Sequence, residues 1–204
     1  MILYEEIMKR WLKPNGTLWV ISDTHFNDPN SKELRGDAYP GDEEVVKLIN
    51  SKVGKKDTLI LLGDVGDISF VRKIRAGYKI LIMGNHDKGA SNYKRREYRI
   101  DTFGNIIDNH LFDEVYEGPV MISDKLILSH EPIFPTLPFL YNIHGHVHNP
   151  LYKGDEHHLN VCAEAIDYTP INLLKLIKKG LLSNIDSIHR LTIDKAIEKK
   201  KRGN

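Results

Sequence analysis

Short apolar runs, each followed by a polar cluster, recur along most of the chain. Five of them lead into clusters rich in Asp, Asn, Gly, Ser and His: Leu18 to Ile21, Thr58 to Leu62, Lys79 to Met83, Lys125 to Leu128 and Tyr141 to Ile143. Short apolar runs bounded in this way are typical of buried strands rather than of helices. The pattern therefore predicts strands that end in side chains able to carry chemistry.

Two segments with helical periodicity lie between the first three apolar runs. Glu43 to Val53 and Ile68 to Ala76 each place apolar residues three and four positions apart on one stripe. Strands that alternate with helices pair in parallel, so we expect an α/β fold.

Further elements are expected towards the two ends. Amphipathic spacing predicts an N-terminal helix at about residues 2–13, a helix from Asn172 to Lys179 that ends at Gly180, and a C-terminal helix with a basic tail at about 183–204. The region from Asp113 to His130 predicts two strands that turn at Ser123, and Leu159 to Ala163 predicts a last strand.

Composition limits the chain to one expected domain, residues 1–204. A chain of 204 residues with 41% hydrophobic residues can bury a substantial core but not several large domains. Lys and Arg total 29 against 28 for Asp and Glu, so no strong field of one sign favours nucleic acid as a partner. The N-terminus does not resemble a signal peptide and no apolar run approaches the ~18 residues that would span a bilayer, so we expect a cytoplasmic protein with no membrane partner.

One cysteine against ten histidines is the most informative ratio. It excludes a disulfide framework and a zinc site rich in thiolates, and it leaves imidazoles for metal or proton chemistry.

Candidate metal ligands follow the five runs. They offer two carboxylates, one amide oxygen and four imidazoles, from Asp23, His25, Asp64, Asn85, His130, His146 and His148. Ligands gather at the carboxyl ends of strands in open α/β sheets, and alternating residues of an extended segment share a side. Seven donors are too many for one ion and suit two. Glycines at 63, 84 and 145 would let the backbone turn sharply there.

This donor set favours certain metals and one reaction. Oxygen and imidazole donors without a thiolate suit manganese, iron, zinc or a similar divalent ion, and argue against copper(I) or an iron–sulfur cluster. Two such ions roughly 3.5–4 Å apart are the usual machinery for hydrolysing phosphate esters. Phosphoester hydrolysis is therefore the leading hypothesis.

The order of the motifs resembles that of a known family. Asp23-x-His25, Gly63-Asp64-x-x-Asp67, Gly84-Asn85-His86-Asp87, Ser129-His130 and Gly145-His146-x-His148 resemble, in order, the five signature blocks of the calcineurin-like metallophosphoesterase superfamily. The resemblance implies a four-layer α/β sandwich, in which two packed mixed β-sheets are flanked by helices and two divalent metal ions lie at one edge.

The resemblance also implies a role for each residue. One ion would be held by Asp23, His25, Asp64 and His148. The other would be held by Asp64, Asn85, His130 and His146, with Asp64 as the bridge between the two ions.

The inferred mechanism is in-line attack on phosphorus by a hydroxide bound to the two metals. His86 would protonate the leaving oxygen, and Asp67 would orient His86 and raise its pKa.

Other features carry weaker hypotheses. The polar stretch from Phe26 to Asp42 and the proline-containing stretch from Glu131 to Leu140 could wall a pocket or be surface insertions. Basic side chains could contact substrate phosphates or be solvated: Arg35, Lys88, Arg95 and Arg96. We expect Asp87 to cap the chain after its turn, His144 to support a ligand or pack in a sheet, and Cys162 to be a buried small hydrophobe.

Three functions remain open at this stage. The first is a phosphatase or phosphodiesterase that acts on a small phosphoester or nucleotide. The second is a nuclease of the same superfamily, which the balanced charge does not favour. The third is a non-catalytic scaffold on the same fold. A scaffold would not explain why all seven metal-binding groups are retained.

Overall fold

The computed structural model describes residues 3–87, 98–100, 106–108, 111–134, 140–187, 197–198 and 200–202. Its helices are α1 (Leu3–Trp11), α2 (Pro29–Arg35), α3 (Asp42–Lys52), α4 (Ile68–Val71) and α5 (Leu173–Lys178), with 3₁₀ helices at Gly36–Ala38 and Ala163–Ile166. Its strands are β1 (Leu18–Ile21), β2 (Thr58–Leu61), β3 (Tyr78–Ile82), β4 (Tyr98–Ile100), β5 (Ile106–Asp108), β6 (Glu114–Tyr116), β7 (Val120–Ser123), β8 (Leu126–Leu128), β9 (Tyr141–His144), β10 (His158–Asn160) and β11 (Ile171–Asn172).

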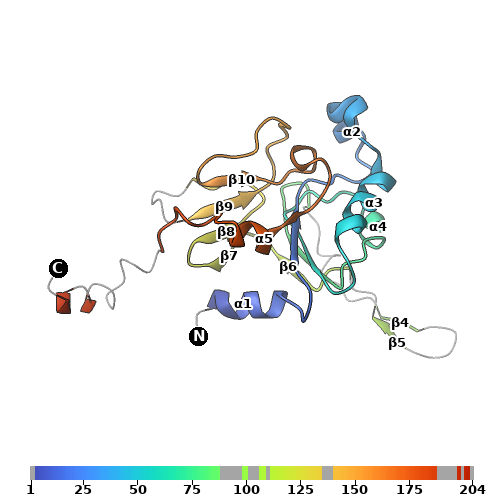
Figure 1. Ribbon diagram of the computed structural model, residues 1–204. Coiled ribbons are helices and arrows are strands. Elements are labelled where there is room, and N and C mark those ends of the chain that lie inside the picture. The colour runs from blue at the N-terminus through green and yellow to red at the C-terminus, as the bar shows by residue number, and fades with distance from the viewer. Residues whose placement is uncertain are drawn as a thin grey trace.

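Two mixed sheets pack face to face (Figure 1). The first has the order β11-β1-β2-β3-β6, in which β1, β2, β3 and β6 are parallel and β11 is antiparallel. The second has the order β10-β9-β8-β7, in which only the β7–β8 pair is antiparallel. The expected sandwich of two mixed sheets flanked by helices is confirmed.

Alternation along the parallel strands builds two cores. Val20, Ile60 and Ile80 face the second sheet, where they meet side chains such as Leu128 and Ile143. Successive side chains of a strand point to opposite faces, so the strands of the first sheet are apolar on both sides.

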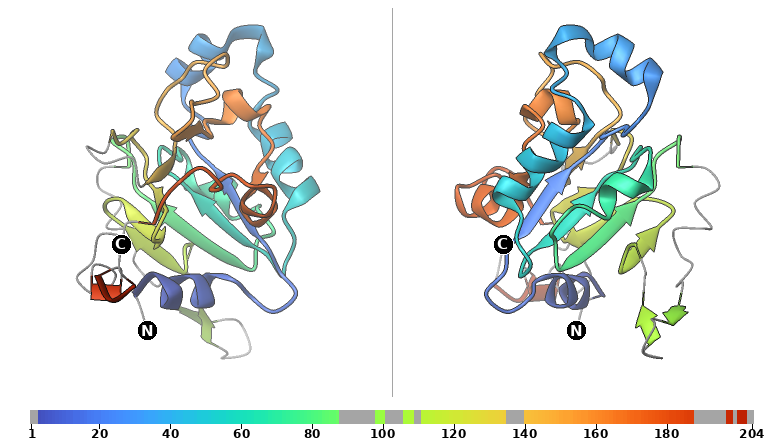
Figure 2. Two further views of the ribbon diagram at one scale, coloured as in Figure 1. Left: turned by 60° about the vertical axis from the view of Figure 1, so that its left-hand side comes forward. Right: turned by 90° about the vertical axis from the view of Figure 1, so that its right-hand side faces the viewer.

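The second core lies on the other face of the first sheet. Leu59, Leu61 and Leu81 meet the apolar stripe of α3, including Val45 and Ile49. In Figures 1 and 2, α3 and α4 accordingly lie on the side of this sheet that faces away from β7–β10.

The register of the first sheet positions the site. Ile21 pairs with Leu61, which pairs in turn with Leu81, so β1, β2 and β3 end level with one another. Their carboxyl ends therefore meet at one edge, as parallel strands require.

Several expected elements differ in extent. The helix expected over 68–76 ends at Val71, and three strands, not two, lie between Asp113 and His130. The strand expected over 159–163 is shorter, because Ala163 already begins a 3₁₀ helix. Ser183 to Ser187 form turns and irregular backbone instead of the start of a helix, while 197–198 and 200–201 are helical.

The stretch from Phe26 to Asp42 contains a helix that the sequence analysis did not anticipate. Asp28 caps α2 by accepting a hydrogen bond from the backbone N–H of Asn30, and Pro29 occupies the first turn. The helix has no periodic apolar stripe in its sequence, so the hydrophobic pattern did not predict it, although the Asp–Pro pair is a typical helix start.

The helices offer no candidate for crossing a membrane: within the described ranges, none is both long and apolar enough.

Candidate metal centre

All seven proposed metal ligands come together at the carboxyl ends of the strands. The turns after β1, β2 and β3 supply four of them, and the turns after β8 and β9 supply the other three. These seven are Asp23, His25, Asp64 and Asn85 from the first sheet, and His130, His146 and His148 from the second. The site therefore lies where the edges of the two sheets meet.

One group of donor atoms gathers around a single Asp23 oxygen. Asp23 Oδ1 lies 3.3 Å from His148 Nε2 and 3.9 Å from His25 Nε2. His25 Nε2 lies 3.6 Å from Asp64 Oδ2. Donor atoms about 2 Å from a shared ion lie roughly 3–4 Å from one another, so this group has the spacing of a metal site.

A second group adjoins the first through Asp64. His130 Nε2 lies 3.4 Å from Asp64 Oδ2, and Asn85 Oδ1 lies 2.9 Å from His130 Nε2 and 3.1 Å from His146 Nδ1. Asp64 Oδ2 is thus close to one histidine of each group, the position expected of a carboxylate shared by two ions.

Two buried polar atoms without hydrogen-bond partners indicate that these residues fit a metal ion. Asp23 Oδ1 and His25 Nε2 are buried and, among the described residues, have no hydrogen-bond partner. A buried polar atom without a partner costs about 1–3 kcal/mol, and a cation between these two atoms would remove that cost. Their oxygen and imidazole chemistry suits a divalent ion, so the residues fit.

The Asp23 carboxylate is oriented by contacts to its other oxygen. Oδ2 accepts hydrogen bonds from the backbone N–H of His146, at 2.8 Å, and from the Cys162 thiol, at 3.1 Å. These two contacts leave Oδ1 for the site. Cys162 is buried as expected, and burial raises the pKa of its thiol. Its sulfur also lies close enough to donor atoms of Asp23 and His148 for the three to hold a metal ion.

Strained backbone marks four of the ligands. Asp23, His25, Asp64 and His146 have φ angles of 56°, 43°, 50° and 65°. A residue other than glycine in this left-handed region costs of order 1–3 kcal/mol, and such strain gathers at functional sites. The strain turns the side chains towards the site immediately after each strand ends.

The backbone at the three glycines comes very close to neighbouring groups. A Cβ atom on Gly145 would lie 2.0 Å from Ser22 Oγ and 2.2 Å from Asp23 Oδ2, and one on Gly84 would lie 2.3 Å from Asp64 Oδ1. Gly63 has φ +90°, and its Cβ would lie 2.4 Å from Gly84 N. The turns between the ligands are thus packed against the ligand carboxylates.

Asp87 links two of the turns that carry proposed ligands. Its buried carboxylate accepts hydrogen bonds from the backbone N–H of Gly84 at 2.9 Å, Asp64 at 2.8 Å and Val65 at 3.1 Å. The first closes the turn after β3, and the other two tie the turn after β2 to it. The chain after Asp87, where the cap was expected, lies outside the described residues. Burial raises the pKa of the Asp87 carboxyl, and the three N–H donors only partly oppose that shift.

His86 and Asp67 are not brought together. The backbone N–H of His86 donates to Asp64 Oδ1 at 2.8 Å, and its exposed ring lies 5.4 Å from the His25 ring. Asp67 instead caps α4 by accepting from Ser69 N at 2.9 Å, and this contact lowers the pKa of its carboxyl. The orienting contact between these two side chains is not formed among the described residues.

Arg35 is buried, which corrects both alternatives considered for it, a solvated side chain and a contact with substrate phosphate. Its Nη2 donates to the backbone oxygen of Asp23 at 2.5 Å and to Glu164 Oε2 at 3.1 Å. The other candidate phosphate contacts, Lys88, Arg95 and Arg96, lie outside the described residues. His144 is buried, and its Nδ1 lies 2.8 Å from the Gly145 backbone oxygen, so it supports the turn that carries His146.

Glu164 was missed by the sequence analysis. Its Oε1 lies 2.5 Å from His148 Nδ1, on the side of the ring away from Asp23. A lone acidic residue within the apolar segment from Val161 to Ile166 was the available signal.

Charge in the site favours a cation. The carboxylates of Asp23 and Glu164, on either side of the ring, raise the pKa of His148 to about 10. Burial alone would raise the pKa of Asp23, but contacts with His148 and other donors outweigh it and lower the pKa to about 2. A site that stabilises positive charge this strongly is suited to a metal ion.

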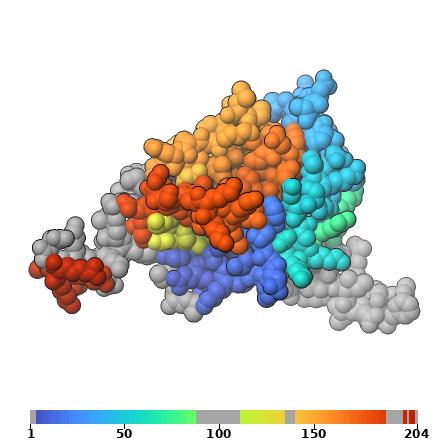
Figure 3. Space-filling view, viewed as in Figure 1, coloured from blue at the N-terminus to red at the C-terminus, as the bar shows by residue number. Residues whose placement is uncertain are grey.

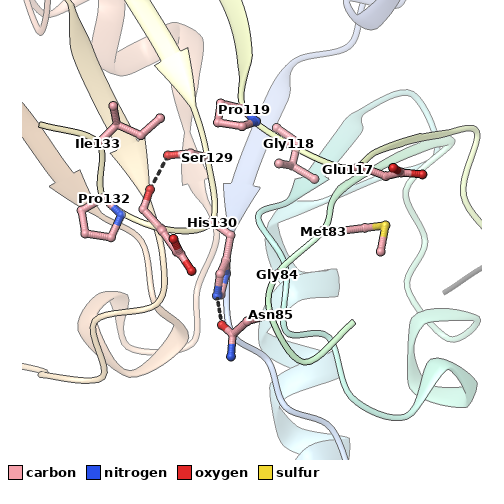
Figure 4. A pocket seen from close by; sticks show the side chains of 12 residues that line it. Met83, Gly84, Asn85, Glu117, Gly118, Pro119, Ser129, His130, Pro132 and Ile133 are labelled. Carbon is pink, nitrogen blue, oxygen red and sulfur yellow. Dashed lines mark hydrogen bonds between the residues drawn. The ribbon is translucent and has the colours of Figure 1, made fainter. Parts of the chain in front are cut away.

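A cavity of about 310 Å³ adjoins the second group (Figure 4). Asn85 and His130 form part of its lining, and Figure 4 shows them at the edge of the space between the two sheets. Most of the remaining lining is apolar or glycine, including Met83, Pro119 and Ile133. The cavity is open to a molecule bound beside the ligand side chains.

Several known proteins are similar to this chain. The sequence model of the calcineurin-like phosphoesterase family matches residues 16–171, a range that includes every proposed ligand. The uncharacterized protein MJ1445 of Methanocaldococcus jannaschii is 29% identical over 185 residues, which cover 80% of this chain and 92% of that protein. The gene 66 protein of Mycobacterium phage L5 is 36% identical over 80 residues, which cover 34% of this chain and 39% of the phage protein.

A solved structure is similar as well. The protein of unknown function AQ665 from Aquifex aeolicus matches with a TM-score of 0.60 and 26% identity, over 81% of this chain and 100% of that one.

Proposed function

The chain belongs to the calcineurin-like phosphoesterase family, and from that premise we propose that it hydrolyses a small phosphoester or nucleotide with two divalent metal ions. Family membership supports phosphoester hydrolysis, a hydrolase and divalent metals in general. Our proposal adds the class of substrate, the number of ions and the residues that hold them.

The observation that carries the proposal is the position of Asp64. Its Oδ2 lies 3.6 Å from His25 Nε2 and 3.4 Å from His130 Nε2, between the two groups of donors. One ion would be held by Asp23, His25, Asp64 and His148, which we call the first metal site. The other would be held by Asp64, Asn85, His130 and His146, which we call the second metal site.

The ions and the protein have separate tasks. Two divalent ions, when bound, offset the charge on phosphoryl oxygens and lower the pKa of water, which is the chemistry that phosphoester hydrolysis needs. Asp64 would offset the repulsion between two such cations, and Asp87 holds the turn that carries Asp64. The buried, strained turns keep the donors in place before the substrate arrives.

His86 is the residue we assign to proton transfer. Its ring is exposed beside the first metal site, and its backbone, rather than its side chain, contacts Asp64. The side chain is therefore free to hold a proton on an imidazole nitrogen and donate it to the leaving oxygen.

The adjoining cavity supports a small substrate. About 310 Å³ beside Asn85 and His130 has room for a leaving group of the size of a nucleoside, with Pro119 and Ile133 as apolar walls. A phosphoester bound at both metal sites could place its leaving group there.

Metal analysis followed by a substrate screen tests the proposal. We expect protein stripped with EDTA to be inactive, to regain two ions per chain when manganese is added, and then to hydrolyse p-nitrophenyl phosphate or bis-p-nitrophenyl phosphate. The preferred ester would separate a phosphatase from a phosphodiesterase. Faster cleavage of a single-stranded oligonucleotide would favour the nuclease, and two bound metals without hydrolysis of any of these would favour the scaffold.

A further inference from the structure

A buried carboxylate stands behind His148. The Glu164 side chain is 9% exposed, and its two oxygens contact different partners: Oε1 lies 2.5 Å from His148 Nδ1, and Oε2 accepts from Arg35 Nη2 at 3.1 Å. The group is thus a carboxylate that joins a proposed ligand to a buried guanidinium.

Arg35 is held as firmly as Glu164. Its side chain is 2% exposed, and its guanidinium carbon lies 5.3 Å from the centre of the Tyr39 ring and 5.6 Å from that of the Tyr168 ring. Nη1 donates to the backbone oxygen of Thr24 at 3.1 Å, and Nη2 donates to that of Asp23. Arg35 therefore also supports the strained turn that presents Asp23.

The contact with Glu164 determines how His148 can bind a metal. A carboxylate beside Nδ1 keeps the proton on that nitrogen and leaves the Nε2 lone pair free, and it makes the imidazole a better donor. His148 Nε2 is the atom that faces Asp23 Oδ1 at 3.3 Å. Glu164 thus selects the tautomer and the ring orientation that the first metal site needs.

The two proposed metal sites differ in the groups that contact the Nδ1 atoms of their histidines. In the first, His25 Nδ1 also contacts a carboxylate, that of Asp28, at 3.1 Å. In the second, His130 Nδ1 lies 2.8 Å from the backbone oxygen of Leu62. Carboxylate support is therefore a feature of both histidines of the first metal site and not of His130.

The segment between β1 and α3 supplies part of this support. Asp28 is the cap of α2, and Arg35 is its last residue. Figures 2 and 3 show α2, in blue, at the same end of the molecule as the orange segment that contains Glu164. The stretch from Phe26 to Asp42 thus supplies contacts to the side of the site away from the donor atoms, through Asp28 and Arg35.

We propose that Glu164 and Arg35 are positioning residues for the first metal site, Glu164 by orienting His148 and Arg35 by holding Glu164 and the Asp23 turn. The inference rests on the ligand assignment in the proposed function. It adds two residues that touch neither metal nor substrate and act only through proposed ligands.

Metal titration of the Glu164→Gln variant tests this proposal. Gln keeps the size of the side chain and can accept from Nδ1–H, but it lacks the charge. We expect Co²⁺ added to EDTA-stripped protein, followed by calorimetry and visible absorption, to fill two sites in the wild type. In the variant we expect one of these affinities to fall roughly 10–100-fold and the other to stay unchanged. Glu33→Gln, an exposed carboxylate on α2, is the matched control and should bind as the wild type does.

An Asn85→Ala background identifies the affected site. This substitution removes a ligand of the second metal site only, so adding Glu164→Gln should weaken the remaining Co²⁺ and alter its absorption spectrum. Arg35→Lys, which cannot reach all three acceptors at once, should weaken the same ion.

Two results would overturn the inference. One is unchanged affinity for both ions in Glu164→Gln and Arg35→Lys, even with a lowered melting temperature, because the residues would then be only structural. The other is loss of the second ion instead of the first. Failure of the wild type itself to bind two ions would contradict the proposed function and is a separate outcome.

Discussion

His86 is the residue whose proposed role depends least on metal binding. Its side chain is exposed and its contact with Asp64 is made by the backbone N–H, so truncation should leave the donor groups intact. We predict that His86→Ala lowers kcat roughly 10²–10⁴-fold while two ions stay bound.

The leaving group provides a control for that prediction. A p-nitrophenolate can leave without being protonated, whereas an alkoxide needs a proton in order to leave. The loss of rate in His86→Ala should therefore be larger for an alkyl phosphoester than for the p-nitrophenyl ester. Steady-state kinetics on both esters, with metal analysis of the same samples, measure this. Full activity on the alkyl ester would remove His86 from the mechanism.

The roles of some single residues could be predicted from the sequence, and those of others could not. Asp23, His25 and Asp64 were predictable as candidate ligands because each lies in the turn after a strand, and strand ends are visible as short apolar runs. The roles of Asp87, Glu164 and Arg35 were not, because their partners are distant in sequence: Glu164 and Arg35 are 129 residues apart. Only packing reveals that a charged residue has become a buried support.

Helix α1 packs Ile7 and Trp11 into the core and also contacts the first sheet through one carboxylate. Glu114, on β6, accepts from Arg10 Nε at 2.6 Å, Trp11 Nε1 at 3.1 Å and Tyr78 Oη at 2.7 Å, and also from the hydroxyl of Tyr116. Burial alone would raise the pKa of Glu114, but its donors outweigh burial and lower the pKa from 4.5 to about 2. The carboxylate form is therefore favoured in the folded state.

This contact predicts a dependence of stability on pH. Because the folded pKa of Glu114 lies below the unfolded value, its contribution is full above about pH 4.5 and declines as the pH falls towards 2. Arg10 is about half exposed, so we expect Glu114→Gln to lower the free energy of unfolding by roughly 2 kcal/mol at pH 7, and by less below pH 4.5.

Urea unfolding of both proteins between pH 2 and 7 measures this difference. Glu6→Gln, an exposed carboxylate on α1, should show almost none. A difference for Glu114→Gln that does not change with pH would show that its charge has no part in docking α1.

Elements with strong apolar periodicity were predictable, and short or polar ones were not. The spacing of Val45 and Ile49 gave α3 a clear signal, and the structure uses it to cover Leu59 and Leu61. Helix α2 buries only Ser31 and Arg35, so no apolar stripe marked it. Tertiary contacts, above all those of Arg35, stabilise it instead.

At the scale of the whole molecule, neither sheet holds a complete set of ligands. Turns of the first sheet present Asp23, His25, Asp64 and Asn85, and turns of the second present His130, His146 and His148. Packing of the two sheets through their shared core is therefore what brings the seven proposed ligands together. The order of the five motifs predicted this arrangement through family resemblance, whereas the apolar pattern alone predicted only the strands.

The central claim is that two ions share Asp64. The measurement that tests it most directly is the number of ions per chain in the wild type and in Asp64→Asn, determined with the rate of phosphoester hydrolysis on the same samples. We predict two ions and hydrolysis for the wild type, and at most one ion with a large loss of rate for Asp64→Asn. Two ions and an unchanged rate in Asp64→Asn would contradict the account.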